Sequence, residues 1–238
     1  MRHMARAMAL VLGLGVLSLA PAAQADHEYS SFFEGTWLAD SGWTDCPQVV
    51  TWSVDVRGLK DRVAKREIRR LKEGWQAWTD ASGLVFDYVG RDRLEFNPVT
   101  NNLQRTDGSV QPDRHVYVAF KSPQQVSLMT GSAVGLGMPS AVLMPERHII
   151  TGMMVFRRGY VLEQRQETPE RVLRLYRHEM GHVMGLGHAG SLSEIMFSQL
   201  DMFATLGPGD REGAAAMMQP CSTDAPTGRR VMTRAWMR

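Results

Sequence analysis

The sequence predicts an α+β fold, a mixed α/β sandwich formed by a single domain. Segments rich in β-branched residues alternate with segments of helical periodicity, in the order strand, helix, four strands, helix, loop, helix. No internal repeat or low-complexity linker divides the chain. Its 238 residues are enough to bury one sizeable hydrophobic core.

The first strand and the first helix lie within residues 47–83. Residues 47–56 (PQVVTWSVDV) alternate in part between apolar and polar side chains and are rich in β-branched residues, which predicts a strand. In the segment that follows, apolar residues recur at the spacing of an amphipathic helix: Ala64, Ile68, Leu71, Trp75 and Trp78. Gly83 ends this helix, and we expect its two tryptophans to lie in the core.

Four further strands are predicted. The first covers residues 84–89, directly after the helix. A long polar segment follows, residues 90–113, which we interpret as a loop of the functional or mobile kind. The remaining strands are expected at residues 115–120, at residues 133–144, with an irregular middle, and at residues 149–156.

The second long helix begins at a strong N-terminal signal. Residues 168–170 (Thr-Pro-Glu) supply a capping hydroxyl, a proline for the first helical position and an acid in the first turn. The helix is expected to run to about Gly185, with an apolar face toward the sheet formed by Val172, Tyr176, Met180 and Val183. A last helix is expected to begin near Pro208 or Asp210 and to end before Cys221.

The stretch HEMGHVMGLGH, at the end of the second long helix, predicts a zinc site. His178 and His182 are four residues apart, so they share one helix face and can hold one ion together. Glu179 is rotated from His178 by about 100°, beside the open position of the metal rather than on it. Gly185 can end the helix with a positive φ and turn the chain back, which carries His188 to the same ion as a third ligand.

This stretch fits HExxHxxGxxH, the motif of the metzincin zinc metalloproteases, and the chain resembles that family, in particular secreted bacterial-style members of its matrixin-like (peptidase M10-type) branch. Met196, eight residues after His188, fits the methionine turn that metzincins carry beneath the zinc. Residues 206–218 (LGPGDREGAAAMM) look like the start of the last matrixin helix. The resemblance covers residues 46–221, the expected catalytic domain.

The resemblance implies a zincin-like architecture: a twisted five-stranded sheet with one antiparallel edge strand, and three main helices. In metzincins the edge strand borders the cleft and pairs with the substrate backbone, a role that would fall here to residues 133–144. The loop that holds a second zinc in matrixins is missing, and the histidines that could rebuild it are scattered: His27, His115 and His148. A calcium site could be formed by loop carbonyls with Asp107 or Asp113.

Four positions depart from the matrixin pattern. Ala189 and Phe197 stand where matrixins usually have a serine and a tyrosine. Ser198 and Leu200 stand in place of the Pro-x-Tyr wall of the primary specificity pocket. The cleavage preference therefore cannot be inferred from the resemblance.

The predicted activity is that of a zinc-dependent endopeptidase, a hydrolase with one catalytic Zn²⁺. A zinc-activated water would attack the peptide bond, with Glu179 as the general base. Two alternatives stay open: a catalytically silent zinc-binding module that recognises peptides or cell-wall polymer, and a zinc amidase that acts on a non-protein amide. The intact Glu179 argues against the silent module.

The N-terminus predicts export. Arg2 and Arg6 precede a short apolar run, and residues 23–25 (Ala-Gln-Ala) form a cleavage signal. Residues 1–25 are therefore interpreted as a signal peptide, followed by a short N-terminal segment, residues 26–45. The apolar run is too short to span a bilayer, so we expect a secreted, extracellular protein without a stable membrane anchor.

The charge balance gives no indication of a nucleic-acid partner. Without residues 1–25, which hold two arginines and no acid, basic and acidic residues balance closely. Residues 222–238 form a basic tail that we expect to be disordered, although Trp236 could anchor an interaction. The expected partners are a protein or peptide substrate, and the expected state is a monomer.

Two cysteines, Cys46 and Cys221, bracket the expected catalytic domain. In an exported protein such a pair predicts one disulfide bond that joins the first strand to the end of the last helix. The alternative is that Cys46 ligates zinc and keeps the enzyme latent, as in matrixin propeptides. The local sequence TDCPQVV lacks the matrixin PRCGxPD pattern, which favours the disulfide.

Overall fold

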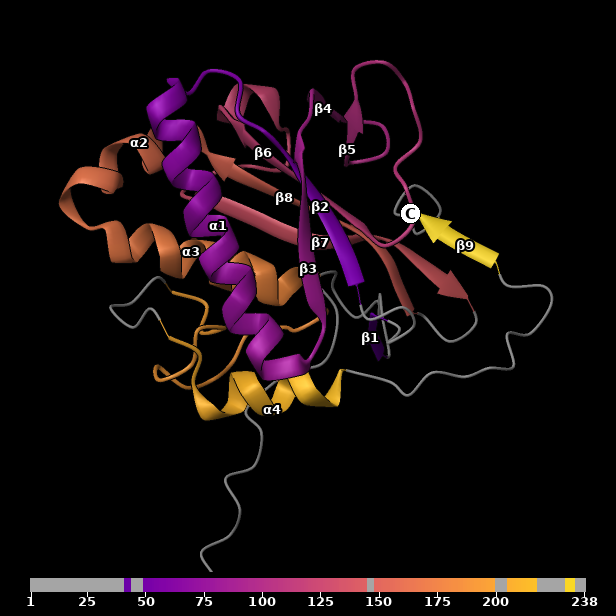
Figure 1. Ribbon diagram of the computed structural model, residues 1–238, viewed down its shortest axis with the longest axis vertical. Coiled ribbons are helices and arrows are strands. Elements are labelled where there is room, and N and C mark those ends of the chain that lie inside the picture. The colour runs from indigo at the N-terminus through magenta and orange to yellow at the C-terminus, as the bar shows by residue number, and fades with distance from the viewer. Residues whose placement is uncertain (1–40, 44–48, 145–147, 200–204, 218–229, 234–238) are drawn as a thin grey trace, which may run out of the picture.

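The computed structural model of the protein describes residues 41–43, 49–144, 148–199, 205–217 and 230–233 (Figure 1). The predicted signal peptide, Cys46 and Cys221 lie outside these residues, so export and the disulfide bond stay predictions. Within the described part of the chain, no helix is long and apolar enough to cross a membrane.

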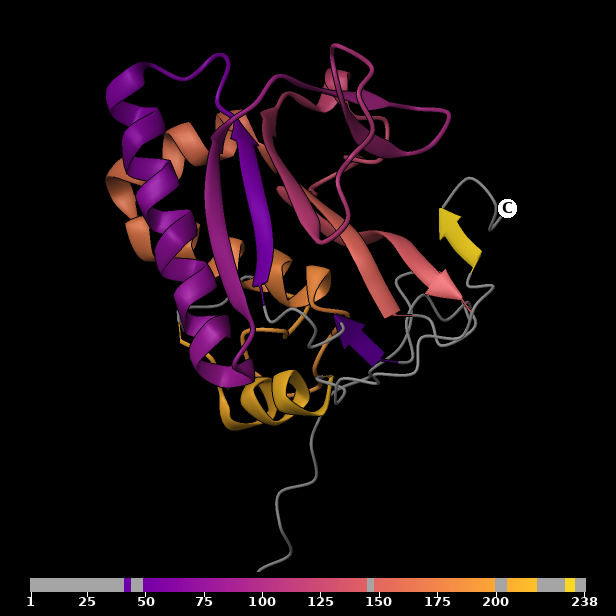
Figure 2. The ribbon, with the colours of Figure 1, turned by 45° about the vertical axis from the view of Figure 1, so that its right-hand side comes forward.

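A twisted, mostly parallel sheet forms the centre of the molecule (Figures 1 and 2). Its main body has five strands, in this spatial order: β3 (Val85–Arg91), β2 (Val49–Asp55), β6 (His115–Lys121), β8 (His148–Arg157) and β7 (Gly135–Met144). Neighbouring strands are parallel except that β7 runs antiparallel to β8. The short strand β1 (Ser41–Trp43) also pairs with β8, in parallel. The predicted mixed α/β class, the five strands and the antiparallel strand are therefore confirmed.

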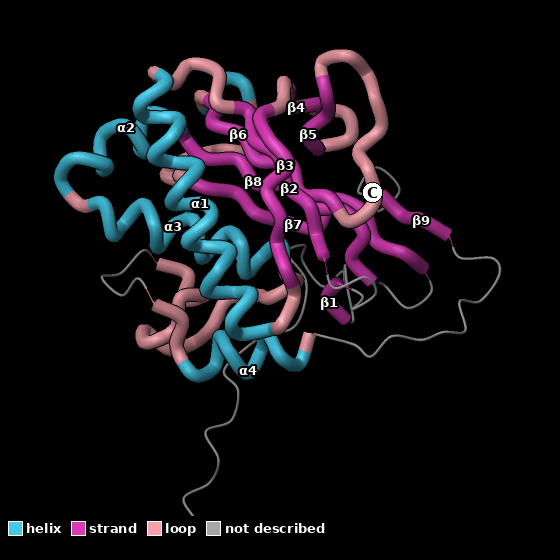
Figure 3. The backbone as a smooth tube through the Cα atoms, viewed as in Figure 1, coloured by secondary structure: helices cyan, strands magenta, loops and turns pink. Residues whose placement is uncertain are grey.

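Two long helices cover one face of this sheet (Figure 3). They are α1 (Asp61–Ser82) and α3 (Pro169–Val183), and both match the predicted segments closely. The last helix, α4 (Pro208–Ala216), begins at the predicted Pro208. A fourth helix, α2 (Arg158–Glu167), was not predicted, because its residues are mostly polar and give little helical periodicity.

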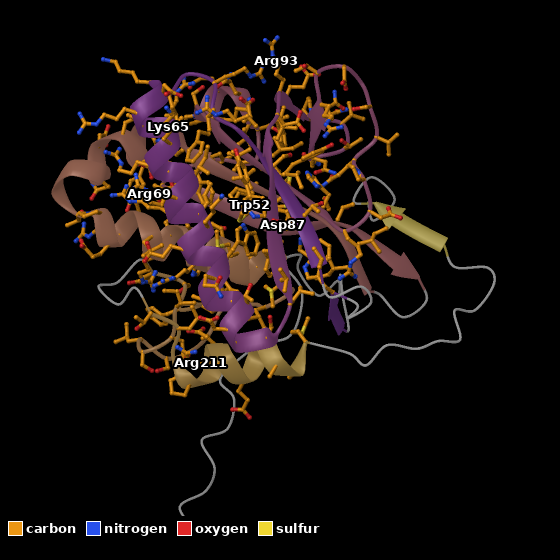
Figure 4. The ribbon with its side chains drawn as sticks, viewed as in Figure 1. Trp52, Lys65, Arg69, Asp87, Arg93 and Arg211 are labelled. Atoms are coloured by element: carbon orange, nitrogen blue, oxygen red, sulfur yellow. The ribbon has the colours of Figure 1, made fainter. Side chains whose placement is uncertain are left out.

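The core lies between the sheet and the helices. Trp75 and Trp78 of α1 are almost fully buried there, as predicted, and Trp75 stacks on Phe86 of β3 with ring centroids 3.9 Å apart. Figure 4 shows Trp52 inside the molecule, whereas Lys65 and Arg69 on the outer side of α1 extend into solvent. This division of α1 into a buried and a charged face is what its apolar spacing predicts.

The opposite face of the sheet is covered by a short hairpin, β4 (Leu94–Asn97) and β5 (Asn102–Arg105). Leu94 and Leu103 are buried under it. The prediction of an uninterrupted loop over residues 90–113 was therefore wrong in this part. Each strand has four residues and one fully buried side chain, which is too short a pattern for apolar alternation to show in the sequence.

A buried ion cluster ties this hairpin to the sheet. Lys121 Nζ at the end of β6 donates to Asp55 Oδ2 at 2.7 Å and to the Leu94 carbonyl at 2.6 Å. Arg57 Nη2 donates to Asp55 Oδ2 at 2.6 Å. Burial raises the pKa of Asp55, but the hydrogen bonds from Arg57 and Lys121 outweigh burial and lower the pKa to about 2.

We expect the ionised Asp55 to make the folded state more stable at neutral pH than in acid. Its folded pKa lies below its unfolded value of about 3.9, so the stabilisation is fully present above that value and is lost as the pH falls toward 2. This difference in pKa corresponds to about 2.5 kcal/mol of unfolding free energy, of which about 2 kcal/mol has been lost at pH 2. Urea unfolding of the wild type and of Asp55→Asn at several pH values measures it: the difference in unfolding free energy should shrink by about that amount between about pH 6 and pH 2. A difference in unfolding free energy that is the same at every pH would contradict a lowered pKa of Asp55. The control is Asp87→Asn, at an exposed site on β3.

A further strand extends the sheet beyond β7. Residues of β9 (Arg230–Thr233) pair antiparallel with Ala141–Met144 of β7. These four residues lie in the tail, 222–238, that the sequence predicts to be disordered, so the structure differs from the prediction there. The segment RVMT contains residues that favour strands, and β7 has an edge with which it can pair. The prediction of disorder rested on the basic charge of the tail, which does not indicate whether a strand partner is available.

Candidate metal centre

The end of α3 reverses the chain as the glycine in the motif predicts. Gly185 has a φ of 101°, in the left-handed region that favours glycine. The Leu186 N–H donates to the Gly181 carbonyl and the Gly185 N–H to the His182 carbonyl, both at 3.0 Å. This pair of bonds is the Schellman motif, which satisfies the last carbonyls of the helix. The residues beyond it are thereby directed back toward α3.

The reversal brings three histidines together. One ligand atom from each of His178, His182 and His188 lies within 4.8 Å of the other two. His178 and His182 are buried, and His188 is exposed. Among the residues that the structure describes, these three form the group of His, Cys, Asp and Glu side chains with ligand atoms close enough to hold a metal ion. The convergence predicted from the motif is thus present in the structure.

Hydrogen bonds orient two of the rings. His178 Nδ1 lies 2.8 Å from the Ile195 carbonyl oxygen, and His182 Nδ1 lies 2.9 Å from the Leu186 carbonyl oxygen. A carbonyl can only accept, so each Nδ1 carries the proton and each Nε2 keeps its lone pair, as a metal ligand requires. Burial lowers the pKa of His178 to about 4 and places the pKa of His182 well below its usual value, so both rings are neutral at pH 7. The donor set therefore fits zinc.

Glu179 lies between α3 and strand β7 and is buried. Burial raises the pKa of its carboxyl group to about 8, against the opposing effect of a hydrogen bond from the Gly137 backbone N–H. Strand β7 can lie this close to Glu179 of α3 only because it has glycines at the positions that face this residue. A Cβ atom at Gly137 would overlap the Glu179 backbone carbonyl, and one at Gly135 would overlap the Glu179 carboxyl group. The two glycines thus make room for Glu179 and for one of its hydrogen-bond donors.

Met196 packs beneath α3 at the level of the histidines. A Cβ atom at Gly181, next to His182 in the helix, would overlap the Met196 sulfur, so the two residues are in close contact. The Ala189 N–H donates to the Met196 carbonyl at 2.9 Å, which links the turn to the segment that carries the third histidine. The placement agrees with the methionine turn that the resemblance implies.

Two buried acids, which the sequence analysis did not assign to the site, hold this turn. Asp210 of α4 accepts hydrogen bonds from the backbone N–H groups of Ile195 at 2.6 Å and Met196 at 3.2 Å. Glu194 accepts from the N–H groups of Gly209 and Asp210, at 3.2 and 2.8 Å, at the start of α4. In the sequence, Glu194 lies beside the predicted methionine turn, and Asp210 lies in the first turn of the predicted last helix. The two segments come together only in the folded chain.

The histidines and Glu179 open into a cavity of about 560 Å³. One wall is formed by residues 132–137, which include the start of β7. Leu175 and Ser198 also line it, so the predicted specificity position Ser198 faces the cavity. The second predicted position, Leu200, lies outside the described residues.

The sheet with its one antiparallel strand, the helix that carries two of the histidines and the reversal that brings the third give the chain a metzincin-like fold. The three histidines are suited to hold one zinc ion. Among solved structures, the chain is similar to the crystal structure of archaemetzincin from Methanopyrus kandleri, with 17% sequence identity, a TM-score of 0.44, and coverage of 72% of this chain and 96% of that chain. No protein-family model and no curated protein matches the chain.

Proposed function

We propose that the protein is a secreted zinc endopeptidase of the matrixin-like type, which hydrolyses proteins or peptides outside the cell and acts as a monomer. One observation carries the catalytic part of this proposal. Three imidazoles converge beside a buried carboxyl group, in a cavity that the edge of a β-sheet borders. Export rests on the predicted signal peptide at residues 1–25.

His178, His182 and His188 would hold the ion. Three neutral ligands leave it the full charge and one open position, which is the arrangement of a catalytic rather than a structural zinc site. Zinc bound there supplies a Lewis acid, which polarises the carbonyl of the scissile bond and lowers the pKa of water. A calcium ion near Asp107 or Asp113 stays a prediction.

Glu179 would move the proton. It follows the first ligand directly and lines the same cavity as all three histidines, so it lies beside the reacting atoms without being a ligand. The positive charge of a zinc ion on the three histidines would lower the pKa of Glu179 and favour the ionised form that a general base needs. Glu179 would then take a proton from the attacking water and hand that proton to the departing amine. The Gly137 N–H holds one part of the carboxyl group, which fixes its orientation toward the cavity.

The edge of β7 would bind the substrate backbone. The described strand β9 pairs with β7 only at Ala141–Met144, whereas residues 135–137 of β7 line the cavity. Unpaired backbone groups of an edge strand bind an extended peptide largely irrespective of its side chains. This mode of binding favours a peptide substrate over a non-protein amide.

Metal removal tests the proposal. The purified protein should contain one zinc ion per chain and cleave casein. Treatment with 1,10-phenanthroline should abolish cleavage, and added zinc should restore it, because only the metal-loaded site polarises the carbonyl. Elemental analysis and casein zymography measure both quantities on one preparation.

The outcomes separate the competing functions. A metal-free protein with full activity would end the proposal. A zinc-loaded protein that never cleaves casein or a peptide library would point instead to the silent binding module or to the amidase.

A further inference from the structure

Strand β9 occupies part of the strand edge that the proposed function assigns to the substrate. β7 pairs with β8 along one edge, from Gly135 to Leu143, and with β9 along the other edge, at Ala141–Met144. Figures 1 and 2 show β9 beside the end of β7, where it is the last strand of the sheet. A peptide that follows the outer edge of β7 would therefore meet β9.

The candidate metal centre lies on the same edge of β7 as β9. The Gly137 N–H donates to the Glu179 carboxyl group, although Gly137 lies in register with Met154 of β8. An N–H group that is bonded to Glu179 is not bonded to β8, so at this residue the donor points away from β8. The edge that carries β9 thus continues into the edge that borders the cavity at residues 135–137.

The distance along β7 from the cavity to β9 is short. Residues 138–140 lie between Gly137, which lines the cavity, and Ala141, which pairs with Thr233 of β9. At a rise of about 3.3 Å per residue, Gly137 and Ala141 are about 13 Å apart along the strand. An extended peptide rises by a similar amount per residue, so about four of its residues can pair with β7 before it reaches β9.

The direction of β9 indicates which part of a substrate it would displace. β9 runs antiparallel to β7, with Thr233 opposite Ala141 and Arg230 opposite Met144. Antiparallel pairs are slightly more stable than parallel ones, so we expect a substrate to bind β7 in the same direction as β9. The N-terminal part of the substrate would then point toward β9. The displaced residues would be those more than about four positions before the cleaved bond.

We propose that β9 limits the length of peptide that the edge of β7 can bind. It takes the place of the N-terminal part of a long substrate, so only about four residues before the cleaved bond pair with the sheet. This inference rests on the proposed peptidase function. The substrates that suit such a site are short peptides and chains that bend away from the sheet before the cleaved bond. A longer extended segment gains no further backbone hydrogen bonds.

A series of peptides measures this limit on the full-length protein. The series starts from a sequence that the wild type cleaves in a peptide library. It is extended on the N-terminal side, so that from about three to about eight residues precede the cleaved bond. For the wild type, kcat/KM should rise until about four residues precede the bond and should then stay constant within about twofold.

The double substitution Val231→Pro, Met232→Pro should remove the limit. The N–H groups of neighbouring strand residues point to opposite edges, so one of the two prolines removes a hydrogen bond to β7 whichever way β9 faces. With the edge open, kcat/KM should rise a further fivefold or more between about five and about eight residues, since each added backbone hydrogen bond strengthens binding about twofold or more. The shortest peptide should be cleaved at the wild-type rate.

The control is Ala235→Pro, Met237→Pro, which introduces two prolines beyond the end of β9 and should keep the wild-type dependence on length. Zinc content and thermal unfolding are measured on all three proteins. A continued rise in the wild type, an unchanged limit in Val231→Pro, Met232→Pro, or an equal effect of the control pair would overturn the inference and leave the proposed function in place. Failure of the wild type to cleave any peptide would overturn both.

Discussion

Glu179→Gln should reduce kcat/KM for a peptide substrate by about a thousandfold or more while the zinc content stays at one ion per chain. Glutamine keeps the size of the side chain and can still accept the hydrogen bond from the Gly137 N–H, but it cannot take a proton from water. Removal of a general base typically costs a factor of about 10²–10⁴. The zinc remains, because the ligands are the three histidines.

The matched control is Glu163→Gln, at an exposed position on α2 away from the cavity. It makes the same chemical change and should leave both activity and metal content unaltered. Steady-state kinetics with a fluorogenic peptide, elemental analysis and thermal unfolding are measured on all three proteins. Normal turnover by Glu179→Gln would show that another group is the base, whereas loss of zinc or of folding in that variant would show that Glu179 supports the site structurally.

Gly137→Ala should damage both the fold and the site. The new methyl group would overlap the Glu179 backbone carbonyl, so β7 and α3 must move apart. Forced packing of this kind costs about 1–3 kcal/mol of unfolding free energy. Since the same movement displaces the Gly137 N–H from the Glu179 carboxyl group, kcat/KM should fall at least about tenfold, a small displacement being enough for such a loss.

Gly159→Ala is the control for this substitution. A Cβ atom at Gly159 would meet no heavy atom within 4 Å, and the residue lies in α2, where alanine favours the helix. Urea unfolding and peptide kinetics should show wild-type values for it. Equal stability and equal activity of the two alanine variants would mean that β7 does not lie as close to α3 as the structure shows.

The features that could be predicted from the sequence are those that depend on near neighbours in the chain. The helical spacing of α1, the proline at the start of α3 and the positive φ of Gly185 each follow from a short stretch of residues, and the structure confirms α1, the start of α3 and the reversal. The prediction that the Thr168 hydroxyl caps α3 was wrong, because this hydroxyl donates to Gln164 Oε1 of α2 instead. The three histidines converge because a helix face and one glycine turn suffice to bring them together.

The features that escaped prediction depend on contacts between distant segments. Asp210 reaches Ile195 and Met196 only after α4 has packed against α1, and Gly137 reaches Glu179 only when β7 lies along α3. The hairpin β4–β5 is stabilised by the ion cluster of Asp55 and Lys121, whose members are 66 positions apart. The sequence pattern within one of these segments does not indicate which distant segment it contacts. Local periodicity therefore could not predict these contacts.

We expect three imidazoles and no sulfur to hold the metal. X-ray absorption spectroscopy on the zinc-loaded, purified protein tests it most directly. We expect three nitrogen ligands at about 2.0–2.1 Å and one oxygen, from His178, His182, His188 and a solvent molecule. A sulfur ligand at about 2.3 Å, as Cys46 would supply, or a spectrum with fewer than three imidazoles, would contradict this assignment of the ligands.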